Sequence, residues 1–160
     1  MGRHAGLAKP AGLLIAVVVF LVLGQWLIDS LRDAEADERE RASIERMITT
    51  VRAAQDGAQV DLATALDLPW DRAFLMEAYM SGDEMNRRLE FAWYDRDAIS
   101  ASDESRQFVV FINGHTVVAD TVLDDDEFQF DEPVESFARS RGQFIVVRED
   151  TSGYVMLSLP

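Results

Sequence analysis

The stretch FVVFINGHTVVA, residues 108–119, decides the fold of this chain. Two apolar runs flank Asn113 and Gly114, and this dipeptide supplies the positive φ angles that a two-residue hairpin turn needs. The sequence therefore predicts an antiparallel hairpin in which Ile112 lies opposite His115.

Both faces of this hairpin are apolar. The predicted register pairs Val110 with Val117 and Phe108 with Ala119 on one face, and Phe111 with Thr116 and Val109 with Val118 on the other. A hairpin with two apolar faces either lies centrally in a sheet or lends one face to a partner.

Two elements are predicted after the hairpin. Pro133, the apolar residues that follow it and Gly142 predict a short helix over residues 133–141. Residues 144–148 and 154–159 flank the turn sequence Asp-Thr-Ser-Gly and predict a closing hairpin.

Three further segments precede the hairpin. Residues 72–80 (RAFLMEAYM) predict a strand, although their composition also suits a helix. Ser81 and Glu84 form a capping box that predicts a short helix, and residues 94–106 are polar enough for a loop. The domain is therefore predicted to be α+β, with a largely antiparallel sheet of four to five strands and two short helices.

A long helix is predicted ahead of this domain. Residues 29–41 are mostly charged, and Glu35 and Arg39 stand at the favourable i, i+4 spacing. Apolar residues then recur at helical spacing until Asp56-Gly57; they are Ile44, Met47, Ile48, Val51 and Ala54. We expect a helical stalk that is solvated over residues 29–41 and has one apolar face after them.

Residues 11–28 (AGLLIAVVVFLVLGQWLI) carry no charge and would extend about 27 Å as a helix. Arg3 and Lys9 precede this run and Asp29 follows it, which keeps the N-terminus cytoplasmic, and Trp26 suits the interface. A cleaved signal peptide or a buried helix is the alternative reading. We expect a retained signal anchor.

These patterns divide the chain into four parts. They are a cytoplasmic N-terminus (1–10), a transmembrane helix (11–28), a juxtamembrane stalk helix (29–58) and an extracytoplasmic α+β domain (59–160).

Composition excludes several classes of function. The net charge is −14 and all acidic residues lie at or after Asp29, so the exported part repels nucleic acid. The chain has no cysteine, which excludes disulfides, thiolate metal sites and a lipid-modified N-terminal cysteine.

No catalytic or metal motif is convincing. His115 is the only histidine after His4 and is expected to be an exposed turn residue, because no nucleophile and orienting group accompany it. The acidic loop at 124–132 lacks the pattern of an EF-hand. We expect no catalytic residue, no metal and no cofactor.

Aromatic residues offer a candidate interaction patch. Trp93 and Tyr94 lie next to the polar loop, and Phe111 lies on one face of the predicted hairpin. Most aromatic side chains of a small domain form its core, so the alternative is that these residues are buried there.

One segment resembles known proteins. Pro69-Trp70-Asp71, Ala78-Tyr79 and the strand at 108–111 resemble small uncharacterised bacterial exported proteins and lipoproteins that share a Trp-Asp, strand, Tyr pattern. The resemblance covers about residues 66–120 and implies no activity. This chain departs from it by having an apolar anchor in place of a lipid-modified cysteine.

The sequence thus predicts a single-pass, extracytoplasmic accessory or protein-interaction module of the bacterial envelope, with an envelope protein as its partner. The first alternative is a ligand- or cation-sensing domain that uses the acidic loop. The second is a small hydrolase.

Protease accessibility tests the predicted topology. A C-terminal tag on the full chain should be digested by protease added outside spheroplasts, because the charge bias sends the domain across the membrane. A protected tag, or a mature N-terminus near Gln25, would show that the chain is not a retained anchor with its domain outside.

Overall fold

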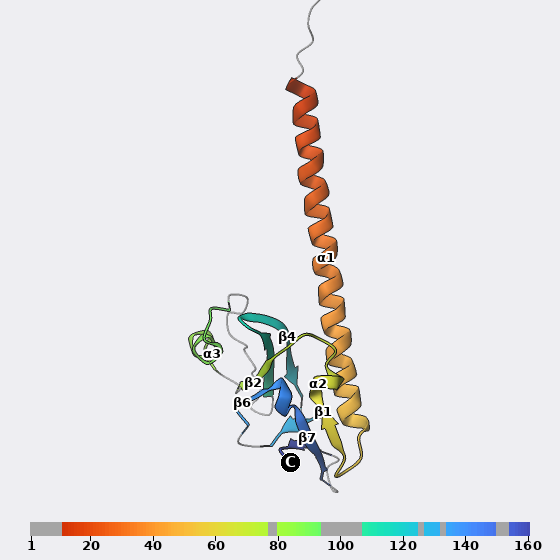
Figure 1. The fold of residues 1–160 in the computed structure, drawn as a ribbon, viewed down its shortest axis with the longest axis vertical. Coiled ribbons are helices and arrows are strands. Elements are labelled where there is room, and N and C mark those ends of the chain that lie inside the picture. The colour runs from red at the N-terminus through yellow and green to blue at the C-terminus, as the bar shows by residue number, and fades with distance from the viewer. Residues whose placement is uncertain (1–10, 77–79, 94–106, 125–126, 132–133, 150–153) are drawn as a thin grey trace, which may run out of the picture. The chain divides into compact units, whose positions relative to one another are not determined.

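The computed structural model describes residues 11–76, 80–93, 107–124, 127–131, 134–149 and 154–160, with side chains from residue 30 onward. The chain divides into two compact units, Met1–Arg39 and Glu40–Pro160. Figure 1 labels the elements. The second unit begins earlier than residue 59, where the sequence places the start of the domain.

The first unit contains the beginning of helix α1 (Ala11–Ala53). The predicted pair is present there, with Arg39 Nη2 3.8 Å from Glu35 Oε2 and both side chains at least 70% exposed. Among helices whose side chains the structure describes, none is long and apolar enough to cross a membrane. The side chains of residues 11–28 lie outside that set, so the span there stays a prediction.

The end of α1 is part of the core of the second unit. Met47 and Val51 are buried, and Ile44 and Ile48 pack against the same cluster, which confirms the predicted apolar face. The helix ends at Ala53.

Arg148, which is remote in sequence, caps the C-terminus of α1. Arg148 donates from Nε to Ala54 O at 3.0 Å and also to Arg52 O, so the guanidinium satisfies carbonyls that the helix leaves unpaired. Asp56 Oδ1 in turn accepts from the Arg148 backbone N–H at 2.9 Å. Strand β7 (Gln143–Arg148), which contains Arg148, thereby holds the helix end in place.

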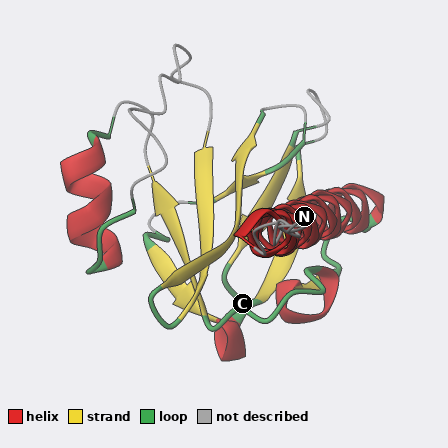
Figure 2. Ribbon diagram, turned by 90° about the horizontal axis from the view of Figure 1, so that it is seen from above, coloured by secondary structure: helices red, strands yellow, loops and turns green. Residues whose placement is uncertain are grey.

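The second unit contains two four-stranded sheets (Figure 2). The first sheet has the order β1 (Gln59–Asp61), β7 (Gln143–Arg148), β8 (Val155–Ser158), β5 (Gln129–Phe130), with β5 and β8 parallel. The second sheet is antiparallel throughout and has the order β4 (Thr116–Leu123), β3 (Gln107–Asn113), β2 (Arg72–Met76), β6 (Ser136–Ala138).

The α+β class and the largely antiparallel pairing are therefore confirmed, but the prediction of one sheet with four to five strands is wrong. The strands that the sequence analysis missed, β1, β5 and β6, have two or three residues each. Such segments are too short to leave an alternating pattern in the sequence. The strand predicted over residues 72–80 is present as β2 over Arg72–Met76, while residues 77–79 lie outside the described residues and Met80 is not in a strand. The closing β7–β8 hairpin is confirmed.

One of the two predicted short helices is present. Helix α3 (Gly82–Leu89) begins at Ser81, whose Oγ accepts from the Glu84 backbone N–H at 3.3 Å. A four-residue helix, α2 (Leu62–Ala65), was not predicted.

The helix predicted over residues 133–141 is wrong. Its described part is strand β6 followed by the 3-10 turn η1 (Arg139–Arg141). Phe137 pairs with Ala73 of β2 and is buried, while its neighbours in β6 are exposed. Pairing with a distant strand has overridden the local helix signals.

The predicted hairpin is present, but its register is wrong. Gly114 and His115 form the two-residue loop, and Asn113 pairs with Thr116. A register shift at Phe111/Ile112 then brings Phe111 opposite Ala119. The Asn113-Gly114 signal placed the turn one residue too early.

The conformation of the turn explains its placement. Gly114 has φ +60°, and Glu90 is the only described non-glycine residue with a positive φ, so His115 has an ordinary one. This matches a turn with glycine at its first central position. The Gly114 N–H donates to Asp71 Oδ2 at 2.8 Å, which fixes the tip from outside the hairpin.

The second sheet buries both of its faces. One face joins the first sheet and α1 in a shared core that contains Trp70, Phe111, Phe128, Phe130, Phe137 and Phe144. The other face carries a second cluster, Phe74, Met76, Met80, Met85, Leu89, Phe108, Val110 and Ile112, to which α3 contributes (Figure 2).

Replacing Gly114 tests the turn. A Cβ at this position would meet nothing within 4 Å, so the cost of Gly114→Val is conformational. We expect a loss of about 1–2 kcal/mol in the free energy of unfolding, because a β-branched residue resists positive φ. Denaturant unfolding of the full chain measures it. The control is His115→Val, which places the same side chain at an ordinary φ; equal losses would contradict this turn.

Candidate interaction surface

His115 is the histidine that a hydrolase would use as its general base. Its surroundings, however, are those of an exposed turn residue. It is exposed at the tip of the β3–β4 hairpin, and its ring centroid lies 5.8 Å from that of Phe91. Among the described residues, the imidazole forms no hydrogen bond or ion pair, and its aromatic neighbour is Phe91. The exposed turn position is as predicted.

The described acidic residues of the loop at 124–132 make local contacts. Glu127 Oε2 accepts from the Asp124 backbone N–H at 3.2 Å, and Asp131 Oδ2 accepts from Ser158 Oγ at 3.2 Å. No group of three metal-ligating side chains occurs among the residues described. Asp125, Asp126 and Glu132 lie outside them.

Phe111, one of the three residues of the predicted patch (Trp93, Tyr94 and Phe111), is not at the surface. Phe111 is fully buried, with its ring 5.3 Å from that of Trp70, so its inclusion was wrong. Side chains alternate along β3, so Phe111 shares with Val109 the face that belongs to the shared core. Tyr94 lies outside the described residues.

Trp93 is the member of the patch that reaches the surface. It is half-buried, and its ring stacks on Phe108 with centroids 6.0 Å apart and planes 10° from parallel. Its backbone N–H donates to Asn86 Oδ1 at 2.8 Å, which ties it to α3. The position is therefore held by both packing and a hydrogen bond.

Three other apolar residues share this environment with Trp93. They are partly buried against the second cluster, and with Trp93 they form what we call the Trp93 surface: Phe91, Trp93, Val117 and Val122. The sequence analysis missed Val122 because its register paired the wrong residues across the hairpin. The observed register brings it opposite Phe108.

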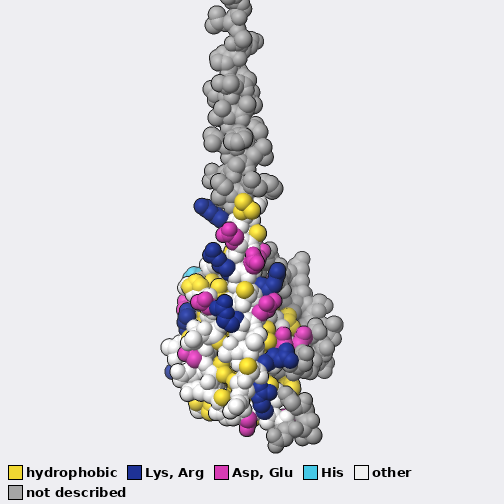
Figure 3. Space-filling model, turned by 90° about the vertical axis from the view of Figure 1, so that its right-hand side faces the viewer, with side chains coloured by type: hydrophobic (Ala, Val, Ile, Leu, Met, Phe, Trp, Pro, Cys, Tyr) yellow, Lys and Arg dark blue, Asp and Glu magenta, His cyan; other side chains and the backbone are white. Residues whose placement is uncertain are grey.

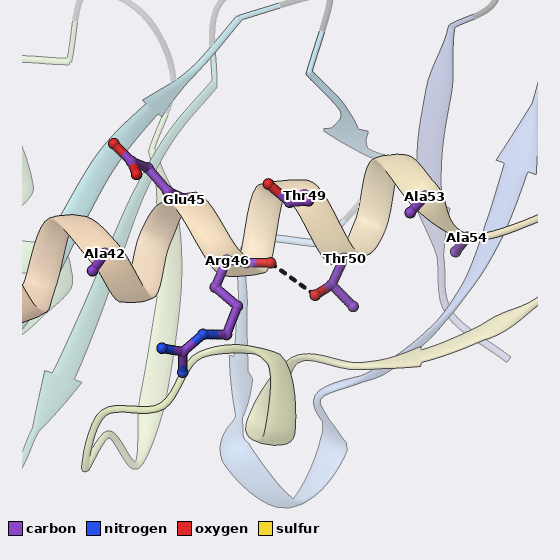
Figure 4. Close-up of a pocket in the computed structure, with 7 residues that line it drawn as sticks. All are labelled: Ala42, Glu45, Arg46, Thr49, Thr50, Ala53 and Ala54. Carbon is purple, nitrogen blue, oxygen red and sulfur yellow. Dashed lines mark hydrogen bonds between the residues drawn. The ribbon is translucent and has the colours of Figure 1, made fainter.

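A shallow hollow lies along the solvent side of α1 (Figure 4). Its volume is about 650 Å³, and its lining consists of Ala42, Glu45, Arg46, Thr49, Thr50, Ala53 and Ala54. Thr50 Oγ1 donates to Arg46 O at 2.7 Å, and Arg46 Nη1 lies 3.3 Å from Asp67 Oδ2. Both members of that ion pair are more than half exposed, so the pair contributes little to stability.

The chemistry of this hollow is not that of an active site. Its lining has one carboxylate, one guanidinium and two hydroxyls, and it includes no histidine that could activate a hydroxyl. Figure 3 shows basic and acidic side chains interspersed on this side of the second unit. Such a surface carries no concentrated charge to attract an ionic ligand.

No known protein family, curated protein or solved structure matches the chain. The resemblance of residues 66–120 to bacterial exported proteins therefore stays a prediction.

Two alanine substitutions separate core from surface. Phe111→Ala should lower the free energy of unfolding by about 3–5 kcal/mol, the usual cost of truncating a buried phenylalanine. Trp93→Ala should cost less, because part of that side chain is already in water. Denaturant unfolding of both variants measures the difference. A larger loss for Trp93→Ala would mean that Trp93 belongs to the core and is not available to a partner.

Proposed function

We propose that the protein is a single-pass, membrane-anchored module of the bacterial envelope whose extracytoplasmic domain binds another envelope protein. The observation that carries the proposal is the continuity of α1. One helix, Ala11–Ala53, includes the charge-free residues 11–28 and also Met47 and Val51, which are buried in the core of the second unit. The same helix therefore carries both the segment that we predict to be the anchor and residues of the domain's core.

The surface of the domain supports binding in preference to catalysis. The Trp93 surface presents partly exposed aromatic and aliphatic side chains that are fixed from behind by the second cluster. Tryptophan is the residue type that most often dominates the binding energy of protein interfaces, and a pre-positioned side chain loses little entropy on binding. The described residues around His115 lack the partners that a catalytic base needs.

The proposal makes the Trp93 surface the contact site. Phe91, Val117 and Val122 are partly exposed on the same cluster as Trp93, and the His115 ring, 5.8 Å from that of Phe91, adds a polar group. This arrangement of an apolar centre with a polar border is typical of protein interfaces. We infer that the partner presents a complementary apolar side chain to Trp93.

Site-specific photo-crosslinking in the native membrane tests the proposal. A benzoylphenylalanine residue in place of Trp93 in the full chain should yield a discrete adduct with an envelope protein. The control is the same residue in place of Thr64, which is exposed on α2. An adduct at both positions, or at neither, would contradict binding through the Trp93 surface.

Two other measurements distinguish the alternatives. Thermal stabilisation of the full chain by calcium would favour a sensing domain that uses the acidic loop. A hydrolytic activity that is abolished by His115→Gln, with folding intact, would favour a hydrolase, because a general base contributes about a hundredfold or more to the rate.

A further inference from the structure

The tip of the β3–β4 hairpin carries a chemically reactive pair of residues. Asparagine is thermolabile, because the backbone nitrogen of the next residue can attack the carbon of its side-chain amide. A glycine in that next position hinders the attack least, since it has no Cβ. Asn113 and Gly114 form this pair, and both are exposed at the end of β3. The tip therefore has the composition and the exposure that ring closure to a succinimide requires.

The reaction needs water as its only co-reactant. The Gly114 nitrogen loses its proton and bonds to Cγ of Asn113, the Cγ–Nδ2 bond breaks, and ammonia leaves with the proton that the nitrogen lost. Water then opens one of the two C–N bonds of the ring. Opening at the side-chain carbonyl gives aspartate at position 113, and opening at the backbone carbonyl gives isoaspartate.

The attacking nitrogen is engaged in the folded protein. The Gly114 N–H donates to Asp71 Oδ2 at 2.8 Å, which is a charge-assisted hydrogen bond. Ring closure requires that this bond break, so that the nitrogen can turn toward the Asn113 side chain. The nearby carboxylate also opposes the loss of the proton, because it repels the negative charge that would develop on the nitrogen.

Asp71 is itself held in place by the backbone. Its N–H donates to Ile112 O at 2.8 Å, and its C=O accepts from the Arg139 N–H at 2.8 Å. Asn113 pairs with Thr116 across the hairpin, which fixes the chain on the other side of the turn. The carboxylate therefore lies against the Gly114 N–H as long as these segments stay paired.

We propose that Asn113 is a site of deamidation through a succinimide, and that Asp71 sets its rate by holding the Gly114 N–H. Conversion adds a negative charge near the Asp71 carboxylate, and isoaspartate lengthens the backbone where Asn113 pairs with Thr116. Both changes weaken the hairpin tip irreversibly. The reaction itself does not depend on a binding partner.

Mass spectrometry of the digested full chain, after incubation in detergent micelles at mildly alkaline pH, measures the conversion of Asn113. Asp71→Ala removes the acceptor, and we expect the rate to rise about tenfold or more, which corresponds to losing a hydrogen bond to a charged group. Both aspartate and isoaspartate should form at position 113, because a succinimide opens to both. Asn86, which Arg87 follows inside α3, is the internal reference and should convert slowly in every variant.

Asp61→Ala is the matched control. The Asp61 carboxylate also accepts from a backbone N–H, that of Ala63 at 2.9 Å, but it lies at the start of α2. Its removal should leave the conversion of Asn113 at the wild-type rate. In urea, where the hydrogen bond to Asp71 is lost, the wild type and Asp71→Ala should convert equally fast.

Thermal melting shows whether each variant is folded. If Asp71→Ala is not folded, Asp71→Asn replaces it; this variant keeps an acceptor oxygen without the charge, so its rate should lie between those of the folded wild type and the chain in urea. A rate in the folded Asp71 variant that does not exceed that of the wild type, an equal rise in Asp61→Ala, or aspartate without isoaspartate would overturn the proposal.

Discussion

The packing of aromatic rings between the two sheets is the interaction on which the rest of the structure depends. Phe137 of β6 lies at its centre, with ring centroids 4.9 Å from Phe144, 5.6 Å from Phe130 and 6.0 Å from Trp70. Neither four-stranded sheet carries enough apolar area alone, so each is stable only when it buries one face against the other. The edge-to-face geometry of Phe137 with Phe144 and with Trp70 adds to the burial itself.

Two arginines fix the remaining elements to this core. The Arg139 guanidinium lies 5.6 Å from the Trp70 ring and donates to Ala63 O at 2.9 Å and to Leu68 O at 3.1 Å, so it holds the segment between α2 and β2. Arg148 does the same for the end of α1. Hydrogen bonds from a charged donor are among the stronger ones, and those of Arg148 join α1 to β7.

Local sequence patterns predicted the structure correctly where it depends mainly on residues close together in the chain. The apolar spacing of Met47 and Val51, the capping box at Ser81 and the glycine of the central hairpin each act within a few residues. The structure follows the first two, and it keeps Gly114 in the turn although the turn lies one residue later than predicted. What could not be predicted depends on partners that are remote in the chain. The turn register is fixed by Asp71, which is 43 residues from Gly114, and residues 136–138 are strand because β2 offers them a place in the sheet.

For the candidate site, too, the sequence predicted the local feature but not the one that depends on strand pairing. Trp93 could be recognised from its position beside a polar segment, and it does reach the surface. Phe111 was misassigned because both faces of its strand are apolar, so the sequence does not show which face is covered by the rest of the domain. Val122 was missed because the extra residue of the bulge in β4, Val118, moves the residues after it to the opposite face, and a bulge leaves no mark in an apolar run.

The central claim is that residues 44–53 of α1 belong to the folded domain and are not an independent stalk. Hydrogen exchange of the full chain in micelles, followed by mass spectrometry at increasing denaturant concentration, tests it most directly. Met47 and Val51 lie in the shared core, so the amides of residues 44–53 should lose protection at the same denaturant concentration as those of β3 and β7. Protection in residues 44–53 that is lost before the sheets open, or that outlasts them, would contradict the account.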